Sequence, residues 1–114
     1  MTEFIHGLGR DDVPAEVAHE VGRCLVDLVG VAVAGSTTPL SRIVRDHVAA
    51  NLRGDSRTAR MLFDGRAVSP VGAALANATT IDAVDAHDGH RLTKGHAGVA
   101  VLPAVLAAEG RNPP

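Results

Sequence analysis

The stretch SPVGAALANATTIDAVDA, residues 69–86, returns the chain to a helix after a segment that breaks the helical period. The side chain of Ser69 can cap the first turn of this helix. Pro70 suits the first helical position, because its fixed φ fits a helix and an N–H is not needed there. Small residues fill the body, and small side chains suit closely packed helices. The stretch therefore predicts a helix that begins at residue 70 and packs closely against its neighbours.

Two helices are predicted upstream. Over residues 14–34, apolar side chains recur at three- and four-residue spacing, which indicates an amphipathic helix. The second half of this helix is apolar almost all round, so we expect it to be deeply buried. Gly35 suits the position just past the helix end. The same periodicity predicts a second helix over residues 39–52.

A hairpin and a last helix complete the predicted fold. The Asp64-Gly65 dipeptide between short runs resembles a tight turn that joins two short strands. Residues 97–109 form the last helix, with Pro103 inside it as a kink or a late start. The predicted fold class is mainly α, with about four helices and one small β-hairpin in a single unit over residues 1–114.

The composition argues against several function classes. Lys plus Arg is 11 and Asp plus Glu is 13, so the net charge is −2, whereas nucleic-acid binding needs a clustered basic face. Cys24 is the only cysteine, which fits a reducing compartment. The first residues lack the pattern of a signal peptide, and the longest apolar run, residues 97–108, is too short to span a bilayer. We therefore expect a cytoplasmic protein with no nucleic-acid and no membrane partner.

The apolar residues are small, and this bears on the expected partners. The apolar share is 46%, yet only two residues are aromatic, and the rest are mostly Ala, Val and Leu. Small side chains bury little area each, so a core made of them is thin. We therefore expect further packing surface from a second copy in a homo-oligomer or from a complementary chain.

Residues 82–96 crowd titratable side chains between the third and fourth predicted helices. Asp82 and Asp85 are three residues apart, so they share a helix face and repel each other. Three histidines supply imidazoles, the side chains that exchange protons near neutral pH, and Lys94 supplies a cation that can hold a carboxylate. Glycines allow the backbone to bend closely around a small ligand. These residues together predict a site for a small acidic molecule with proton-transfer groups beside it; the histidines are His87, His90 and His96.

Two other interpretations of this cluster stay open from the residues alone. The His87-Asp88 pair, with His90 and His96, could bind a divalent metal, as in metal-dependent phosphohydrolases of the HD type. The histidines do not follow the i, i+4 spacing of a zincin helix, and we assign no metal site. Alternatively, the segment is a solvated connector in a noncatalytic helical association module, polar and rich in glycine as loops are.

Two segments of the chain form a recognisable pattern: ALANATTIDAVDAHD, residues 74–88, and GHAGVAVLPAVLAAEG, residues 95–110. They resemble the MmgE/PrpD family, which includes 2-methylcitrate dehydratase, cis-aconitate decarboxylase and iminodisuccinate epimerase. That family has an asparagine in a small-residue helix, then an LD-x-DD element, then a histidine ahead of a proline-containing helix that ends in AE. Asn77, Asp85 and His96 are the counterparts here. The first predicted helix is similar to the family's D-x-x-G-x-x-x-A-G pattern, so the resemblance covers nearly the whole chain.

The resemblance implies an activity and assigns roles to residues. Asp85 matches the family's active-site aspartate and His96 its active-site histidine, which makes them the catalytic acid/base candidates. Lys94 is the candidate carboxylate anchor, with Asp88 and His90 as further substrate-binding candidates. The implied reaction removes a proton next to a carboxylate of a small polycarboxylate and then loses water or carbon dioxide, or reprotonates the other face. The resemblance implies neither a metal nor an organic cofactor.

The chain departs from the family pattern in sequence and in length. Asp82 stands where the family has a histidine, His87 where it has the first aspartate of the DD pair, and Gly89 where it has a threonine. Family members are several-fold longer, with a large helical domain built from both chain ends and a lid domain between. We therefore expect the N-terminal segment of such a helical domain, without the lid and the C-terminal helices, and inactive by itself.

Overall fold

The computed structural model describes residues 1–87, 89–92 and 94–109. The predicted fold class is confirmed, since these residues are mostly helical with one small antiparallel sheet. A short helix that was not predicted, α1, precedes the four expected helices. The elements are, in order, α1 (Thr2–Gly7), a 3-10 turn (Arg10–Asp12), α2 (Ala15–Ser36), α3 (Pro39–Asn51), β1 (Ala59–Arg60), β2 (Ala67–Val68), α4 (Pro70–Asp82) and α5 (Ala97–Glu109).

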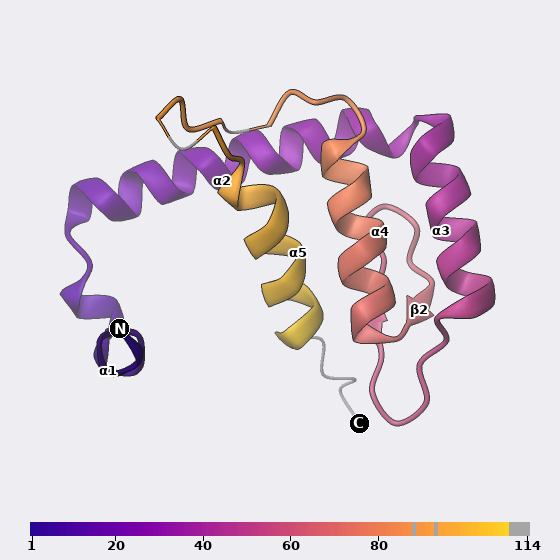
Figure 1. Cartoon of the computed structure of the whole chain (residues 1–114), viewed down its shortest axis with the longest axis horizontal. Helices are drawn as coiled ribbons and strands as arrows, with labels where there is room; N and C mark the ends of the chain where they lie inside the picture. Colours follow the sequence, from indigo (N-terminus) through magenta and orange to yellow (C-terminus); the bar gives the residue numbers. More distant parts are fainter. Residues whose placement is uncertain (88, 93, 110–114) are drawn as a thin grey trace.

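Helix α4 is the centre of the arrangement. Helices α3, α4 and α5 extend side by side from the long helix α2, and the hairpin lies beside α4 (Figure 1). Helix α4 contacts α2, α3, α5 and both strands, whereas α1 packs against none of the other elements that the structure describes. Every element that forms the core therefore depends on the surface of α4.

The sequence of α4 explains why it forms and why it is buried. The side chain of Ser69 accepts a hydrogen bond from the backbone N–H of Gly72 at 3.1 Å, and Pro70 is the first residue of the helix, so both predicted start signals are confirmed. The buried faces of the helix consist of small or β-branched residues together with one asparagine. Small side chains on several faces allow three helices to approach it at once.

The approach of α2 to α4 requires a glycine. A Cβ on Gly35 would lie 1.9 Å from the backbone oxygen of Thr80, a distance that no side chain tolerates. The prediction that Gly35 lies just past the end of α2 is wrong, because α2 continues to Ser36 and the residue that follows it is Thr37. The glycine is needed for its missing side chain in contact with α4, and not for the end of the helix. Gly72 allows α3 to approach α4 in the same way, since a Cβ there would lie 2.9 Å from Val48 Cγ1.

The predicted hairpin is confirmed, and Asn77 fixes it to α4. Strands β1 and β2 pair in antiparallel register on either side of the Asp64-Gly65 turn. The buried side chain of Asn77 accepts a hydrogen bond from the N–H of Leu62 at 2.7 Å and donates one to the carbonyl of Arg60 at 3.4 Å. The family-like asparagine therefore has a structural role in this chain.

An ion pair braces the same hairpin. The guanidinium of Arg66 donates hydrogen bonds to the carboxylate of Asp64, one of them 2.7 Å long from Nη2. These bonds hold the pKa of Asp64 below its usual range. Arg66 also lies 3.0 Å from the carboxylate of Asp46, which connects the turn to α3.

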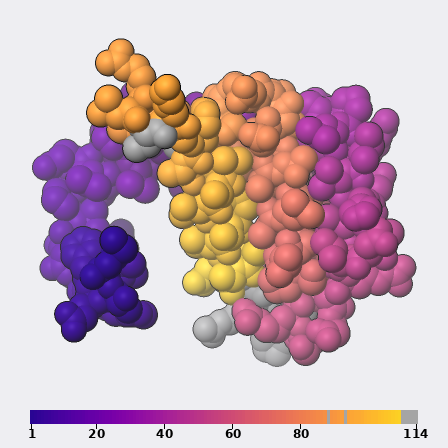
Figure 2. Space-filling view, viewed as in Figure 1, coloured from indigo at the N-terminus to yellow at the C-terminus, as the bar shows by residue number. Residues whose placement is uncertain are grey.

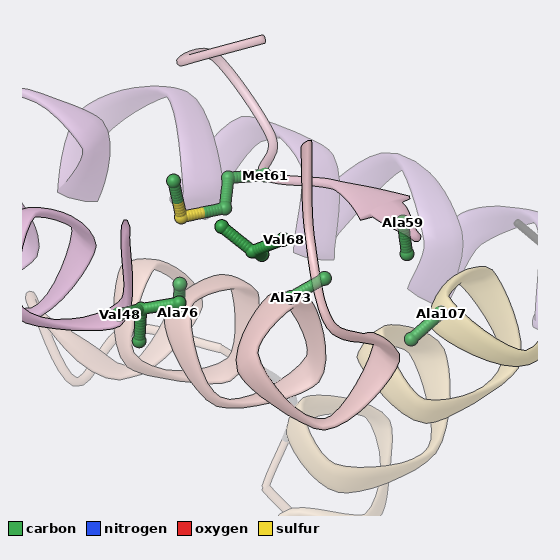
Figure 3. Packing of buried hydrophobic residues seen from close by; sticks show 7 residues of the cluster. All are labelled: Val48, Ala59, Met61, Val68, Ala73, Ala76 and Ala107. Carbon is green, nitrogen blue, oxygen red and sulfur yellow. The ribbon is translucent and has the colours of Figure 1, made fainter. Parts of the chain in front are cut away.

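Two apolar clusters form the core. The larger one joins α3, the hairpin, α4 and α5, and its members are shown in Figure 3: Val48, Ala59, Met61, Val68, Ala73, Ala76 and Ala107. The smaller one consists of Leu28 and Ala32 from α2 and Ile81 from α4, with Val99 and Leu102 of α5 packed against it. The smaller cluster joins the end of α4 to the start of α5, which is where the candidate site lies.

Much of α2 is exposed, contrary to the expectation for its second half. Its buried residues are Leu28, Ala32 and Gly35, whereas Val29 and Val33 are about half exposed because no described element covers their side of the helix. An open groove of about 650 Å³ lies between the first half of α2 and α5, and a hollow is visible between the N-terminal segment and α5 in Figure 2. The core is thin, as the composition predicted.

None of the described helices is by itself long and apolar enough to cross a membrane. Helices α2 and α3 meet the length and composition criteria only when taken together, and they are bent by 87° relative to each other.

The close contact at Gly35 leads to a stability prediction. Replacing Gly35 with Ala should lower the free energy of unfolding by about 1–3 kcal/mol, because the new methyl group must displace the backbone of α4. Gly30→Ala in the same helix is the matched control. Since nothing lies within 4 Å of a Cβ there, the better helix propensity of Ala should raise stability by about 0.5–1 kcal/mol. Urea denaturation followed by circular dichroism measures both changes, and equal stability of the two variants would contradict the packing described here.

Candidate functional site

The candidate site is the segment that joins the end of α4 to the start of α5. Asp82 is the last residue of α4, and His96 directly precedes α5. Below the segment, Ile81 of α4 is fully buried, and Val99 and Leu102 of α5 pack in the same cluster. The two ends of the segment are therefore held close together by the core.

The backbone of this segment turns sharply at two of the predicted site residues. Asp85 has a φ of 46° and Lys94 a φ of 50°, in the left-handed region that side chains other than glycine adopt rarely. The N–H of Asp85 donates a hydrogen bond to the carbonyl of Asp82 at 2.9 Å, which closes the turn after α4. Such backbone conformations cost free energy and occur often at functional sites.

A second tight turn presents the histidine and lysine side chains. The N–H of His90 donates to the carbonyl of Gly95 at 3.0 Å, and the N–H of Lys94 donates to the carbonyl of His90 at 2.8 Å. This small loop closes on itself and leads directly into His96. Its short hydrogen bonds place the side chains of the turn next to the start of α5.

Three titratable side chains converge between the two turns. One carboxylate oxygen of Asp85 and one ring nitrogen each of His87 and His96 all lie within 4.8 Å of one another. The rings of His87 and His96 are in contact, with centroids 4.5 Å apart and planes tilted by 53°. His87 is buried, whereas Asp85 and His96 are exposed. The exposed carboxylate of Asp85 and imidazole of His96 therefore lie beside the buried imidazole of His87.

The buried His87 has a carboxylate partner on one side only. Its Nε2 lies 3.6 Å from Oδ1 of Asp82, within ion-pair reach but too long for a hydrogen bond. Its Nδ1 is buried and has no hydrogen-bond partner among the described residues. A buried ring nitrogen without a partner is costly, so His87 Nδ1 stands out among the polar atoms that the structure describes.

Gly89 provides space for the ring of His96. A Cβ at this position would lie 3.2 Å from Cε1 of His96, closer than nearly all such contacts. A side chain at this position would require the ring to shift by a few tenths of an ångström. The missing side chain of Gly89 therefore leaves the room that the imidazole of His96 occupies.

A groove of about 460 Å³ lies beside His96. It is lined by Gly89, His90, Arg91, Lys94, Gly95 and His96. Arg91 and Lys94 are fixed cations, so this surface favours an anionic ligand. Asp85 is not one of the described residues that line this groove. Its carboxylate lies within 4.8 Å of a ring nitrogen of His96.

The structure brings most of the predicted site residues together. Asp85 and His96, the acid/base candidates, are adjacent, and Lys94 and His90 lie with His96 in one groove. The predicted substrate-binding residue Asp88 lies outside the described residues. Arg91 also lines the groove, although the sequence-based prediction gave it no part in the site. Its positive charge within the titratable cluster was the signal that could have identified it.

Comparison with known proteins identifies the relationship. A model of the MmgE/PrpD N-terminal domain matches residues 1–111. The chain belongs to the MmgE/PrpD family. This finding confirms the resemblance that the motifs around Asn77, Asp85 and His96 indicate.

Curated relatives place the family membership in context. The cis-aconitate decarboxylase of Aspergillus terreus is 31% identical over 102 residues, which are 89% of this chain and 20% of the relative. The same values hold for the cis-aconitate decarboxylase of one named strain of that fungus. The chain thus spans about one fifth of the length of these relatives. No solved structure matches the chain.

Two departures from the family motif meet in the structure. Asp82 stands where the MmgE/PrpD pattern has a histidine, and His87 stands where it has an aspartate. Their side chains face each other at 3.6 Å. In this chain the two positions at which the sequence differs from the family resemblance thus hold a carboxylate and an imidazole that lie beside each other.

The burial of His87 leads to a second stability prediction. His87→Ala should lower the free energy of unfolding by about 1–3 kcal/mol, because the side chain is 1% exposed and supports the ring of His96. His47→Ala, an exposed position on α3, should change stability by at most about 0.5 kcal/mol. Thermal and urea unfolding measure both. If His87→Ala changes stability no more than the control does, His87 is not part of the packed structure.

Proposed function

We propose that residues 1–114 form one wall of an active site in which Asp85 and His96 transfer protons next to a carboxylate of a small polycarboxylate. Membership of the MmgE/PrpD family and the similarity to cis-aconitate decarboxylase support a lyase-like activity. The observation that carries the proposal is the convergence of the Asp85 carboxylate and the His96 imidazole within 4.8 Å. This distance allows both groups to reach one small substrate.

The two groups have complementary chemistry. An ionised carboxylate accepts a proton, and an imidazolium donates one, so the pair can remove a proton from carbon and protonate a leaving group or a carbanion. In a dehydration, one group takes the proton from the carbon next to the carboxylate and the other protonates the departing hydroxyl. In a decarboxylation, the carbon–carbon bond breaks, its electron pair stays on the remaining carbon, and the acid supplies a proton there. An epimerisation uses the same pair to return the proton to the opposite face.

The groove beside His96 supplies the binding part of the proposal. Lys94 and Arg91 offer positive charge, and His90 lines the same surface. A polycarboxylate carries several anionic groups, so one carboxylate can be held by these cations while another part of the molecule lies against Asp85 and His96. Fixed cations that orient the substrate raise the rate by placing the reacting carbon next to the base.

The opposite wall of the site must come from outside the described residues. Asp85 and His96 are both exposed, and the groove beside His96 is open. The apolar faces of α2 and α5 are exposed as well, which suits packing against a complementary chain or a second copy. We propose that such packing completes the site and excludes water from it.

A chimera tests the proposal. Residues 1–111 replace the corresponding segment of the A. terreus cis-aconitate decarboxylase, and release of carbon dioxide from cis-aconitate is measured. We expect turnover in the chimera, and a loss of about 100- to 10,000-fold in kcat when Asp85→Asn or His96→Gln removes an acid/base group. His47→Ala, on the exposed side of α3 and remote from the site, is the control and should retain the rate.

Two results would contradict the proposal. One is a folded chimera, verified by circular dichroism, that has no turnover. The other is a chimera whose Asp85→Asn and His96→Gln variants both react as fast as the His47→Ala control. A rise in KM with unchanged kcat on replacing Lys94 would, in contrast, support its role as carboxylate anchor.

A further inference from the structure

We propose that Asp85, His87 and His96 form a binding site for one divalent transition-metal ion such as Zn²⁺. This inference goes beyond the proposed function and does not depend on it. It also departs from the sequence-based expectation, which assigned no metal. Two imidazoles and one carboxylate are a ligand set that proteins use for zinc, with a fourth position left open.

The geometry is close to what such an ion requires. Ligand atoms at roughly 2.0–2.1 Å from a tetrahedral ion are roughly 3.4 Å apart. The three candidate ligand atoms lie within 4.8 Å of one another. The side chains of Asp85 and His96 are exposed, so small rotations about their side-chain bonds can close the remaining gap. The carboxylate of Asp85 already lies within 4.8 Å of a ring nitrogen of each histidine.

The unpartnered nitrogen of His87 is the second, independent observation. Its Nδ1 is buried and has no hydrogen-bond partner among the described residues, which leaves a lone pair or a proton unsatisfied. Its Nε2 faces the carboxylate of Asp82 at 3.6 Å. Histidines that bind metals commonly donate their other ring N–H to a carboxylate, which orients the ring and makes it a better ligand. Asp82 lies on the Nε2 side of His87, where a small movement of its carboxylate would form this hydrogen bond, and Nδ1 is left for the ion.

A bound ion and the proposed proton transfer exclude each other. The ion would occupy the lone pairs of Asp85 and His96 that acid/base chemistry needs. The site would then have three protein ligands, and its fourth position would accept water or a carboxylate of an anionic ligand. The metal site is therefore inferred as a competing state of the same residues, one that inhibits proton transfer.

Isothermal titration of the tag-free, metal-stripped chain with ZnCl₂ tests the inference without any substrate. We expect one ion per chain in the wild type. Asp85→Asn and His96→Gln should each weaken binding by at least about 100-fold, and Asp82→Asn by about 10- to 100-fold, because outer carboxylates contribute less than ligands do. His47→Ala is the matched control, an exposed histidine away from the cluster that should leave the affinity unchanged.

Titration with Co²⁺ provides a second readout, because visible absorption bands of the bound ion report nitrogen and oxygen ligands in a tetrahedral arrangement. Because His87→Ala is expected to lose stability, the exposed Asp85 and His96 positions decide the outcome, with the fold of each variant checked by circular dichroism. Absence of zinc binding to the wild type would overturn the inference. Equal affinity in the wild type, Asp85→Asn and His96→Gln would overturn it as well, whatever the activity of the chimera.

Discussion

The contact between α2 and α4 at Gly35 and Thr80 constrains the rest of this structure. The backbones of the two helices come so close that no side chain fits between them. This contact fixes the last turns of α4 beside α2, and Ile81 of α4 then packs with Leu28 and Ala32. Helix α5 packs against the same cluster through Val99 and Leu102. The end of α4 and the start of α5, and hence the residues between them, are placed by a core made of small side chains.

Although the core is thin, it places the candidate site at one end of the packed helices. Small residues on α4 bury little area each, but they allow α2, α3 and α5 to surround a single helix. Asn77 adds a polar tie that holds the hairpin on the same helix. The segment that joins α4 to α5 lies at one end of these packed helices, and its Asp85 and His96 side chains are exposed. The packed helices and the candidate site are thus separate parts of the structure, and Ile81 lies where they meet.

The proton-transfer site and the metal site proposed above share two residues, and the buried imidazole of His87 distinguishes them. Asp85 and His96 meet beside His87, and the ring of His87 is backed by Asp82. Asp82 and His87 are two positions at which the sequence differs from the pattern that the resemblance implies. His87 places an imidazole, with one ring nitrogen unpartnered among the described residues, next to the two proposed catalytic groups. That imidazole is what a metal ion would use and a proton-transfer reaction would not need.

Local sequence signals predicted α2 to α5 and the hairpin. The contacts between these elements could not be predicted, because they depend on the tertiary structure. The cap at Ser69, the proline at position 70 and the Asp64-Gly65 turn act over a few residues, so α4 and the hairpin could be predicted from the sequence. The role of Gly35 could not, because a glycine near a helix end has two uses and only the position of Thr80 distinguishes them. Asp85 and His96 were predicted through the family motif. The contact of His87 with His96 depends on how two turns fold back, which no sequence spacing specifies.

The central claim is that the segment between α4 and α5 brings the rings of His87 and His96 into contact. Nuclear Overhauser spectroscopy of the labelled chain tests this claim directly, because cross-peaks between ring protons arise only at short range. With ring centroids 4.5 Å apart, the structure predicts clear cross-peaks between the two imidazoles. Assigned ring signals with no cross-peak between them would contradict the account.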